Sequence, residues 1–477
     1  MNGSRPNPLT VSDTASVRRF HPSRMPPYQI EPIDMHRFIT QRFAIPSARL
    51  WVAAIGWICL SVVSASDQVP APPQSRPIVI RGATLHRVDQ PVMQNGDLLF
   101  DDGRITGIGS DIDIPDNAKI IDAAGKHVYP GLIESMTDLG LREISNQSAT
   151  VDNTEFGSIN PNAKSWVAVN PDSELIPVAR SGGVLLANVA PLGRWIRGQS
   201  AVMMLDGWTY QDMVLSAPSG LCLNWDHITG RGGDADLARR DERLDEFTER
   251  LDQARRYALG RQRDGERTHA DLRLESLIPV IEGRVPVIAT ANRQSAIESA
   301  VAFCRSQSLR LIIHGGFDAE QCAELLKAND IGVLIPGTYR LPIRRSDRYD
   351  AAYTLPARLQ RAGVRFAIGG EGSGSPGGAS LTQNLPYHAG CAVAYGLSRQ
   401  DALRSITLSP AEILGVEDRV GSLTVGKDAT LLIADGDILE TETQVTDAFI
   451  TGRPVDLSNR HTMLHQKYRQ KYRQANR

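Results

Sequence analysis

The sequence predicts an α/β protein in which strands and helices alternate around a parallel sheet, with a smaller β-rich block toward each end of the chain. Residues 172–408 carry the first observation, because short apolar runs alternate there with longer segments of helical periodicity, an order typical of successive βα units. The β-rich blocks are the second observation, since short apolar runs separated by turn-forming residues occur near residues 78–121 and 421–455. A chain of 477 residues, 41% of them hydrophobic, can bury a core for each part.

The central region is expected to contain strands of a parallel sheet that alternate with helices. The expected strands are Gly183–Ala190, Gly220–Asn224, Val285–Ala291, Arg310–His314, Ile331–Ile335 and Arg365–Ile368. The expected helices are Asp172–Ser181, Asp236–Leu259, Gln294–Ser306, Asp318–Lys327, Ala351–Ala362 and Arg399–Leu408. The second helix repeats leucine or alanine every seven residues, which predicts an amphipathic helix with a solvated outer face.

The first 65 residues have the pattern of an export signal. Leu50–Val63 is an apolar stretch preceded by Arg37, Arg42 and Arg49, and Val63-Ser64-Ala65 has the form of a small-residue cleavage site. A membrane-spanning helix needs about 20 apolar residues, and this stretch is shorter. We therefore expect a signal peptide and an exported, periplasmic protein; an uncleaved N-terminal anchor is the alternative.

Composition excludes some classes of partner. The net charge of −2 and the pI near 6.6 show no basic excess, so no nucleic-acid partner is expected. The cysteines after the signal form no C-x-x-C pair. Buried free thiols are expected for them, and a disulfide between Cys304 and Cys322 is the alternative in an exported protein.

Three stretches carry a resemblance to a known family: PGLIE at residues 130–134, GQSAVMMLDG at 198–207 and GSLTVGKDATLLIADGD at 421–437. They resemble the amidohydrolase superfamily, and in particular its exported, imidazolonepropionase-like members. The resemblance covers most of residues 76–460. It implies a distorted (β/α)8 TIM barrel with a small composite β-sandwich domain built from both chain ends.

The resemblance also implies domain boundaries. These are residues 1–65 for the N-terminal extension and signal peptide, 66–77 for a linker, 78–129 for the first part of the sandwich, 130–418 for the barrel, 419–460 for the second part of the sandwich and 461–477 for a basic C-terminal tail. The tail is expected to dock on the body or to fray.

The family places a His-x-His pair after its first barrel strand, and here the two positions hold Met136 and Asp138. Two imidazoles two residues apart on a strand point the same way and can share one divalent ion. A thioether and a carboxylate are a poor substitute for them. The resemblance therefore implies a degraded metal-ligand set.

Asp138, His314 and Glu371 are the candidate catalytic residues, because each lies at the expected end of a barrel strand. Glu371 stands where the family has the Asp that activates water, and is the candidate general base. His314 is a candidate electrophile or ligand and Asp138 a candidate ligand or orienting group. His314 precedes the family position by one residue, which reverses its face on a strand, so a packing role is the alternative for it.

The candidate cleft residues are Met136, Thr290, Asn292 and Gln199. Thr290 and Asn292 lie in VPVIATANR, where the family often has His-Ala-His-Arg. Gln199 belongs to Gly198-Gln199-Ser200, which is expected to form a loop lining the cleft. No complete metal site is predicted. A divalent metal such as zinc would have to use Asp138, His314 and Glu371 as its three ligands, because the His-x-His pair is missing.

The leading functional hypothesis from the resemblance is hydrolysis of non-peptide C–N bonds, as in cyclic amides and imides, with an altered or lost metal site. The alternative is a catalytically silent binding or scaffold protein of the cell envelope. Loss of three imidazoles favours the alternative, and a carboxylate and an imidazole at strand ends favour the enzyme. In both cases the expected partner is a small-molecule substrate or ligand, without a stable membrane span after signal cleavage; a homo-oligomer is compatible with either.

Overall fold

A computed structural model describes residues 69–229, 234–264, 269–371 and 378–475. The chain divides into two compact units, Met1–Ser64 and Ala65–Arg477, and all the described residues belong to the second. The predicted signal peptide lies outside the described residues.

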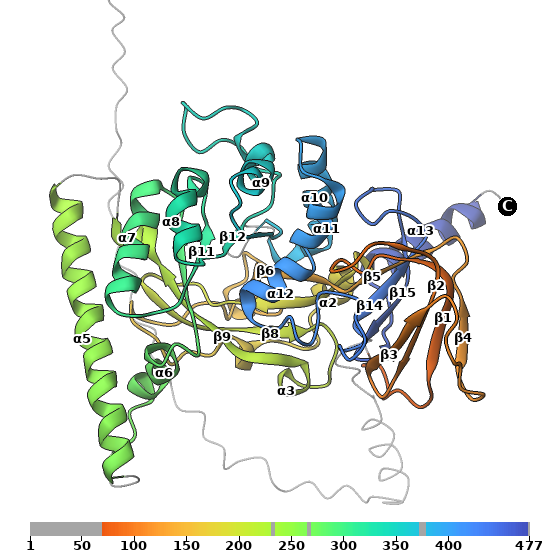
Figure 1. The fold of residues 1–477 in the computed structure, drawn as a ribbon, viewed down its shortest axis with the longest axis horizontal. Helices are drawn as coiled ribbons and strands as arrows, with labels where there is room; N and C mark the ends of the chain where they lie inside the picture. The colour runs from red at the N-terminus through yellow and green to blue at the C-terminus, as the bar shows by residue number, and fades with distance from the viewer. Residues whose placement is uncertain (1–68, 230–233, 265–268, 372–377, 476–477) are drawn as a thin grey trace, which may run out of the picture. The chain divides into compact units, whose positions relative to one another are not determined.

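The larger part of this unit is a sheet of eight strands in sequence order (Figure 1). They are β6 (Leu132–Thr137), β7 (Val184–Val189), β8 (Ile196–Met204), β9 (Val214–Asn224), β10 (Val287–Ala291), β11 (Leu311–Gly315), β12 (Val333–Ile335) and β13 (Phe366–Ile368). Neighbouring strands are parallel except at β8, which is antiparallel to both β7 and β9. The strands are almost wholly buried, as expected for a sheet covered by helices.

A side chain joins the first and last strands of this sheet. Glu134 of β6 accepts hydrogen bonds from the backbone N–H of Gly370, just after β13, at 2.8 Å and from that of Met136 at 3.3 Å. A Cβ added to Gly369 or Gly370 would lie 2.9 or 2.7 Å from a Glu134 carboxylate oxygen. Glycine at both positions therefore lets the backbone approach closely enough to bring the barrel near to closure.

The helices of this unit are α2 (Leu175–Ser181), α3 (Tyr210–Met213), α4 (Trp225–Thr229), α5 (Asp234–Asp264), α6 (Leu272–Ile281), α7 (Gln294–Ser306), α8 (Ala323–Ala328), α9 (Ala351–Arg361), α10 (Leu385–Ala394), α11 (Arg399–Ser405), α12 (Leu408–Leu414) and α13 (Arg460–Ala475). Short 3-10 turns are η1 (Ser148–Thr150), η2 (Ser165–Ala168), η4 (Ala319–Cys322) and η5 (Ala379–Asn384). Helix α7 illustrates their packing: its buried Ile297, Ala300, Val301 and Cys304 share one face.

The predicted fold class, a distorted (β/α)8 barrel, is confirmed, and each expected strand and helix of the central region is present, most of them with shifted ends. One prediction is wrong. Gly198-Gln199-Ser200 is not a loop but the interior of β8, paired with β9 and fully buried. Gly198 has φ +130° and an added Cβ would lie 2.7 Å from the carbonyl oxygen of Ala163. A close backbone contact explains the glycine that looked like a turn signal.

A second sheet contains strands from both ends of the chain, as predicted for the composite domain. Its order is β16-β15-β14-β5-β1-β2-β3, and β4 also pairs with β1. The strands are β1 (Ile78–Leu85), β2 (Met93–Asp101), β3 (Arg104–Gly109), β4 (Lys119–Asp122), β5 (His127–Pro130), β14 (Leu431–Ala434), β15 (Val445–Ile450) and β16 (Arg453–Pro454). The edge-to-face contact between the Phe100 and Phe449 rings, with centroids 5.1 Å apart, joins the two chain ends in one core.

The long helix α5 runs along the outside of the barrel (Figure 1). It docks through Phe247, Leu251 and Ala254, which are fully buried, and the Phe247 ring packs against Trp195 with centroids 6.0 Å apart. The other side is charged, as the amphipathic pattern predicts. No helix in the described ranges is long and apolar enough to cross a membrane.

Candidate functional site

The carboxylate of Asp138, directly after β6, is neutralised by neighbours within the same region of the chain. Its Oδ2 atom lies 3.1 Å from Arg142 Nη2 and accepts a hydrogen bond from Asn153 Nδ2 at 2.9 Å. Asp138 is completely buried, and the Arg142 side chain is largely so. Because a buried carboxylate needs a paired cation, this arrangement accounts for Asp138 as a structural ion pair.

Met136, the other residue at a family metal-ligand position, packs inside the barrel. Its side chain is buried, and its Sδ atom lies 3.9 Å from Asn188 Nδ2. Asn188 also donates to the carbonyl oxygen of Ser135 at 3.1 Å and accepts from Ser219 Oγ at 2.7 Å. The thioether therefore belongs to a hydrogen-bonded interior layer.

Arg197, Thr290 and His314 form a second polar cluster. Arg197 lies near the beginning of β8, and because β8 is antiparallel, that end lies beside the carboxyl ends of β9 and β10. Arg197 Nη1 donates to Thr290 Oγ1 at 3.1 Å, and Thr290 Oγ1 lies 3.2 Å from His314 Nδ1. Thr290 and His314 are register partners on β10 and β11, so their side chains share one face of the sheet.

Burial determines the charge state of this cluster. His314 has a pKa lowered to about 3 by burial, and the charge of Arg197 lowers it further, so the imidazole is neutral at pH 7. Burial also lowers the pKa of Arg197, partly offset by Cys222 and Asp226. Within the described ranges no carboxylate forms an ion pair with Arg197, which donates hydrogen bonds to Thr290 Oγ1 and to the carbonyl oxygen of Gly193.

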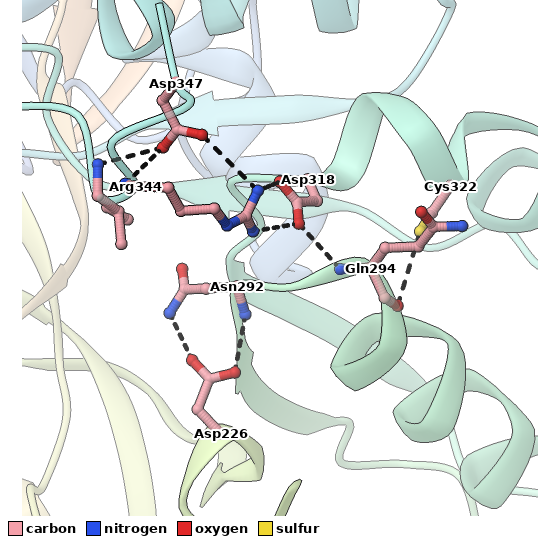
Figure 2. A network of polar contacts seen from close by, with 8 residues as sticks. Asp226, Asn292, Gln294, Asp318, Cys322, Arg344 and Asp347 are labelled. Atoms are coloured by element: carbon pink, nitrogen blue, oxygen red, sulfur yellow. Dashed lines mark hydrogen bonds and ion pairs between the residues drawn. The ribbon is translucent and has the colours of Figure 1, made fainter. Parts of the chain in front are cut away.

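Asn292 and Gln199, two predicted cleft residues, are each bound by neighbouring elements. Asn292 donates to Asp226 through its backbone N–H at 3.1 Å and through Nδ2 at 2.6 Å, as Figure 2 shows. Gln199 donates from Nε2 to the carbonyl oxygen of Ser276 on α6 at 3.3 Å. Asn292 therefore ties the end of β10 to α4, and Gln199 ties the interior of β8 to α6.

Glu371, the third candidate catalytic residue, follows Gly370 after β13 and is partly exposed. A second carboxylate, that of Glu134, is buried beside the preceding residue, Gly370. Glu134 was not predicted as a site residue. Burial raises the pKa of Glu134 from 4.5 to about 7, and hydrogen bonds from the backbone N–H groups of Met136, Gly370 and Ser135 oppose that rise. No cation among the described residues forms an ion pair with it.

A pocket of about 420 Å³ opens between the segment after β11 and the loop that joins β12 to α9. Asp318 anchors the two: its carboxylate binds Arg344, whose Nη1 lies 3.1 Å from Oδ1, and accepts from the backbone N–H of Gln294 at 3.1 Å (Figure 2). Arg344 also lies 3.8 Å from Asp347. The wall on this side is thus an internally paired charge network.

Among the other arginines that line the pocket, two are paired with a carboxylate and two are not. Arg348 pairs with Asp350, and Arg358 pairs with Glu320. Arg340 instead lies over the ring of Phe317, with Cζ 3.7 Å from the centroid, and burial lowers the pKa of Arg340 to about 10, so it stays charged at pH 7. Arg361 donates to the carbonyl oxygen of Ala357. The described residues offer neither Arg340 nor Arg361 a carboxylate at ion-pair distance.

Comparison with known proteins agrees with this architecture. The model of the amidohydrolase family matches residues 323–457. A solved amidohydrolase from Thermotoga maritima superposes with a TM-score of 0.69 at 25% identity, covering 80% of this chain and 99% of that one. In sequence and in fold the chain is similar to the amidohydrolase superfamily.

Sequence relatives within the superfamily match only parts of their own length. Amidohydrolase tasK of Hapsidospora irregularis is 24% identical over 409 residues, which are 77% of this chain and 41% of the relative. Imidazolonepropionase of Syntrophobacter fumaroxidans is 34% identical over 113 residues, 24% of each chain. The chain therefore spans about two fifths of the first relative and about a quarter of the second.

Among the described residues, the side chains at the family's ligand positions do not form a site for the divalent metal of the family pattern. A catalytic zinc needs three protein ligands and an open position. Nowhere in the described ranges do three or more His, Cys, Asp or Glu side chains gather so that they could hold a metal ion. Asp138 is paired with Arg142, and the guanidinium of Arg197 lies against Thr290. Asp138, His314 and Glu371 are not brought together as a three-ligand site.

Arg197, Glu134 and Arg340 were not predicted as site residues, because none of them occupies a metal-ligand position of the superfamily pattern. One signal was available for Arg197, a charged residue inside the otherwise apolar and polar-neutral run WIRGQSAVMM. A charge in a buried strand calls for a partner. Nothing local in the sequence identifies Thr290 as that partner.

Proposed function

We propose that this member of the amidohydrolase superfamily binds small organic anions at the carboxyl ends of its barrel strands and has lost the metal site of the family. The observation that carries the proposal is the position of Arg197. Its guanidinium lies 3.1 Å from Thr290, the position at which the family has a histidine, and beside the neutral imidazole of His314. A fixed cation thus stands next to a position where the family pattern puts a metal ligand.

Electrostatics opposes a divalent ion near this cluster. A guanidinium is always protonated in proteins and cannot coordinate a metal. Its charge repels a second cation, the more strongly because the cluster is buried. A neutral His314 could donate a lone pair to a metal, but its companions are a hydroxyl and a cation. These groups suit an oxyanion, which accepts hydrogen bonds from a guanidinium and a hydroxyl.

The pocket beside Arg340 supports the same chemistry. The face of its guanidinium is held over Phe317, and stacking of this kind leaves the N–H edges free to bind a carboxylate or phosphate. Apolar Pro342 and Ile343 line the same pocket. A ligand with an oxyanion group and an apolar body matches these walls, and the volume of about 420 Å³ is in the range of small-molecule sites.

Hydrolysis of a non-peptide C–N bond is the second candidate function. It is favoured by the relatives, which are named as an amidohydrolase and an imidazolonepropionase, and by the carboxylate of Glu371 after the last barrel strand. In this alternative Glu371 acts as the general base on water. The neutral His314 cannot serve as a general acid near pH 7, because its pKa is about 3.

Metal content and anion binding, measured on the same untagged full-length preparation, test the two candidates. We expect less than about a tenth of an equivalent of zinc by elemental analysis and no turnover of hydantoin. We expect calorimetry to detect binding of benzoate or phenyl phosphate but not of neutral benzamide.

Variants assign that binding to residues. Arg340→Gln and Arg197→Met are expected to weaken the anion at least about tenfold, as loss of a charge-assisted contact does. Arg284→Gln is the matched control, because Arg284 is exposed, pairs with Glu282 and does not line the pocket. About one equivalent of metal that is lost in Glu371→Ala, together with turnover, would refute the proposal in favour of the hydrolase.

A further inference from the structure

Helix α13 (Arg460–Ala475) presents an unpartnered basic surface. All of its residues are exposed, and none is buried against the rest of the chain. Its start is nevertheless fixed, because Oδ1 of the buried Asn459 accepts from the N–H groups of His461 and Thr462 at 2.9 and 3.1 Å. This is a helix N-cap. The helix therefore begins at a defined point of the composite domain and lies free beyond it.

The side chains of α13 sort into three faces. At about 100° per residue, Leu464, Tyr468 and Tyr472 follow one another every four positions and form a narrow apolar stripe. Lysine and arginine flank the stripe on both sides: Arg460, Lys467 and Lys471 on one, Arg469 and Arg473 on the other. The face opposite the stripe carries Gln466, Gln470 and Gln474.

The helix contains five Lys or Arg and no Asp or Glu, although the whole chain has a net charge of −2. Lys471 Nζ lies 5.9 Å from the Tyr468 ring centroid, which shows the cationic flank reaching the aromatic stripe. Concentration of positive charge on one helix is therefore a local property and not a reflection of composition.

We propose that α13 lies on an anionic lipid surface. Helices that lie in the plane of a bilayer carry an apolar stripe bordered by Lys and Arg, whose stems extend along the apolar region while their charges bind lipid phosphates. Tyrosine favours the level of the lipid headgroups, because its ring is apolar and its hydroxyl forms hydrogen bonds with water. Each of the features required is present in α13, and this proposal is independent of the function proposed for the barrel.

A second copy of the chain fits this surface less well. Pairing two α13 helices through their stripes would place the basic flanks of both against each other without any acidic residue to offset them. Like-charge contact of this kind is unfavourable. A three-residue stripe also offers little apolar area compared with a stable protein interface.

Vesicle binding of the full chain tests the proposal. Co-sedimentation is measured with phosphatidylcholine vesicles and with vesicles containing 30% phosphatidylglycerol; the neutral vesicles account for any binding by the apolar segment at Leu50–Val63. We expect at least about twentyfold tighter binding to the anionic vesicles, and loss of this preference in 0.5 M salt, because the attraction is electrostatic.

Two double variants locate the contact. Lys467→Gln/Lys471→Gln should weaken binding to anionic vesicles about 25-fold, since each basic residue near the surface contributes about fivefold. The matched control Arg305→Gln/Arg310→Gln removes two exposed charges elsewhere and should change binding less than about twofold. Tyr468→Ser/Tyr472→Ser should also weaken binding, by at least about fivefold.

Three outcomes would overturn the proposal: equal binding to both kinds of vesicle, equal effects of the two charge variants, or tighter binding of a 20-nucleotide RNA than of anionic vesicles. Light scattering that shows a dimer lost only in the tyrosine variant would assign the stripe to self-association instead. Since α13 buries nothing, all variants should keep the melting temperature of the parent protein, which distinguishes loss of binding from loss of folding.

Discussion

A buried charged side chain follows the end of β6 and another lies at the start of β8, and the two charges have different partners. At the end of β6, Asp138 has Arg142 at 3.1 Å and Asn153 at 2.9 Å. At the start of β8, Arg197 has a hydroxyl and a carbonyl oxygen as hydrogen-bond partners and no carboxylate in an ion pair among the described residues. Asp138 has an ion-pair partner, and Arg197 has none among the described residues.

This difference separates a structural charge from a functional one. A buried ion pair offsets its own charge and leaves little electrostatic attraction for a ligand, although Oδ1 of Asp138 has no hydrogen-bond partner among the described residues. A buried cation without an anion costs free energy in the empty protein, and an anionic ligand would recover that cost. We therefore infer that a ligand binds at the face shared by β8, β10 and β11 and not at the family's first metal position, after β6.

The largest expected effect on the free energy of unfolding comes from breaking the ion pair between Asp138 and Arg142. Arg142→Met leaves Asp138 buried and uncompensated, and should lower the free energy of unfolding by about 4 kcal/mol, measured by urea denaturation at pH 7. The exposed pair provides the control: Arg284→Met, which removes the partner of Glu282, should cost less than about 1 kcal/mol. A loss below 1 kcal/mol for Arg142→Met would show that Asp138 is not held as an ion pair.

Glu134 is a third buried ionisable side chain, and it differs from Asp138 because it has no ion-pair partner among the described residues and is protonated below its raised pKa. Its pKa in the folded protein is raised from 4.5 to about 7 by burial. The folded state therefore binds the proton more tightly, and this stabilisation is fully present below pH 4.5 and is lost as the pH rises through 7. Between those limits the contribution amounts to roughly 3 kcal/mol.

The variant Glu134→Gln isolates this contribution, because an amide oxygen can still accept from the N–H of Gly370. The free energy of unfolding of the parent, minus that of the variant, should fall as the pH rises from 5 to 8. His314 has the opposite sign: burial lowers its pKa from 6.5 to about 3, so its contribution is lost as the pH falls below 6.5, and it cancels in the difference. A pH-independent difference would contradict the assigned pKa of Glu134.

The smallest expected effect has the opposite direction. Arg197→Met removes an uncompensated buried charge and keeps an apolar stem, so the free energy of unfolding should stay the same or rise by about 1 kcal/mol. The measurement is the same urea titration used for Arg142→Met, which makes the two arginines a direct pair. A loss of 3 kcal/mol or more would mean that Arg197 has a structural counter-ion, as Asp138 has.

Much of the fold followed from local sequence patterns. Strands such as β10 and β11 were predicted because apolar runs of strand length sit between helical segments, and the composite sheet was predicted from the resemblance of the two terminal blocks. Strand β8 was missed as a strand, because Gly198, Gln199 and Ser200 have the composition of a turn. Its strand conformation comes from pairing with β7 and β9 on both sides, and tertiary pairing can override local preference.

The candidate site was less predictable for the same reason. Asp138, His314 and Glu371 were selected by their positions at strand ends, and their catalytic roles stay predictions. The partners that decide what each residue can do came from elsewhere in the chain. Thr290 meets Arg197 across 93 positions of sequence, and Arg340 meets Phe317 across a strand and a helix.

The sequence by itself determined the resemblance to the superfamily, most of the strands in their order and the absence of the His-x-His pair, because each can be recognised from residues close together in the chain. The sheet made from both chain ends followed from the family resemblance of the two terminal blocks. Only the tertiary structure decided which buried charges are balanced. That balance depends on side chains from different strands, and the antiparallel direction of β8 is what carries Arg197 to the carboxyl end of β10. The residue type determines the charge of a side chain, but only the packed fold determines its distance from other charges, on which their interaction energy depends.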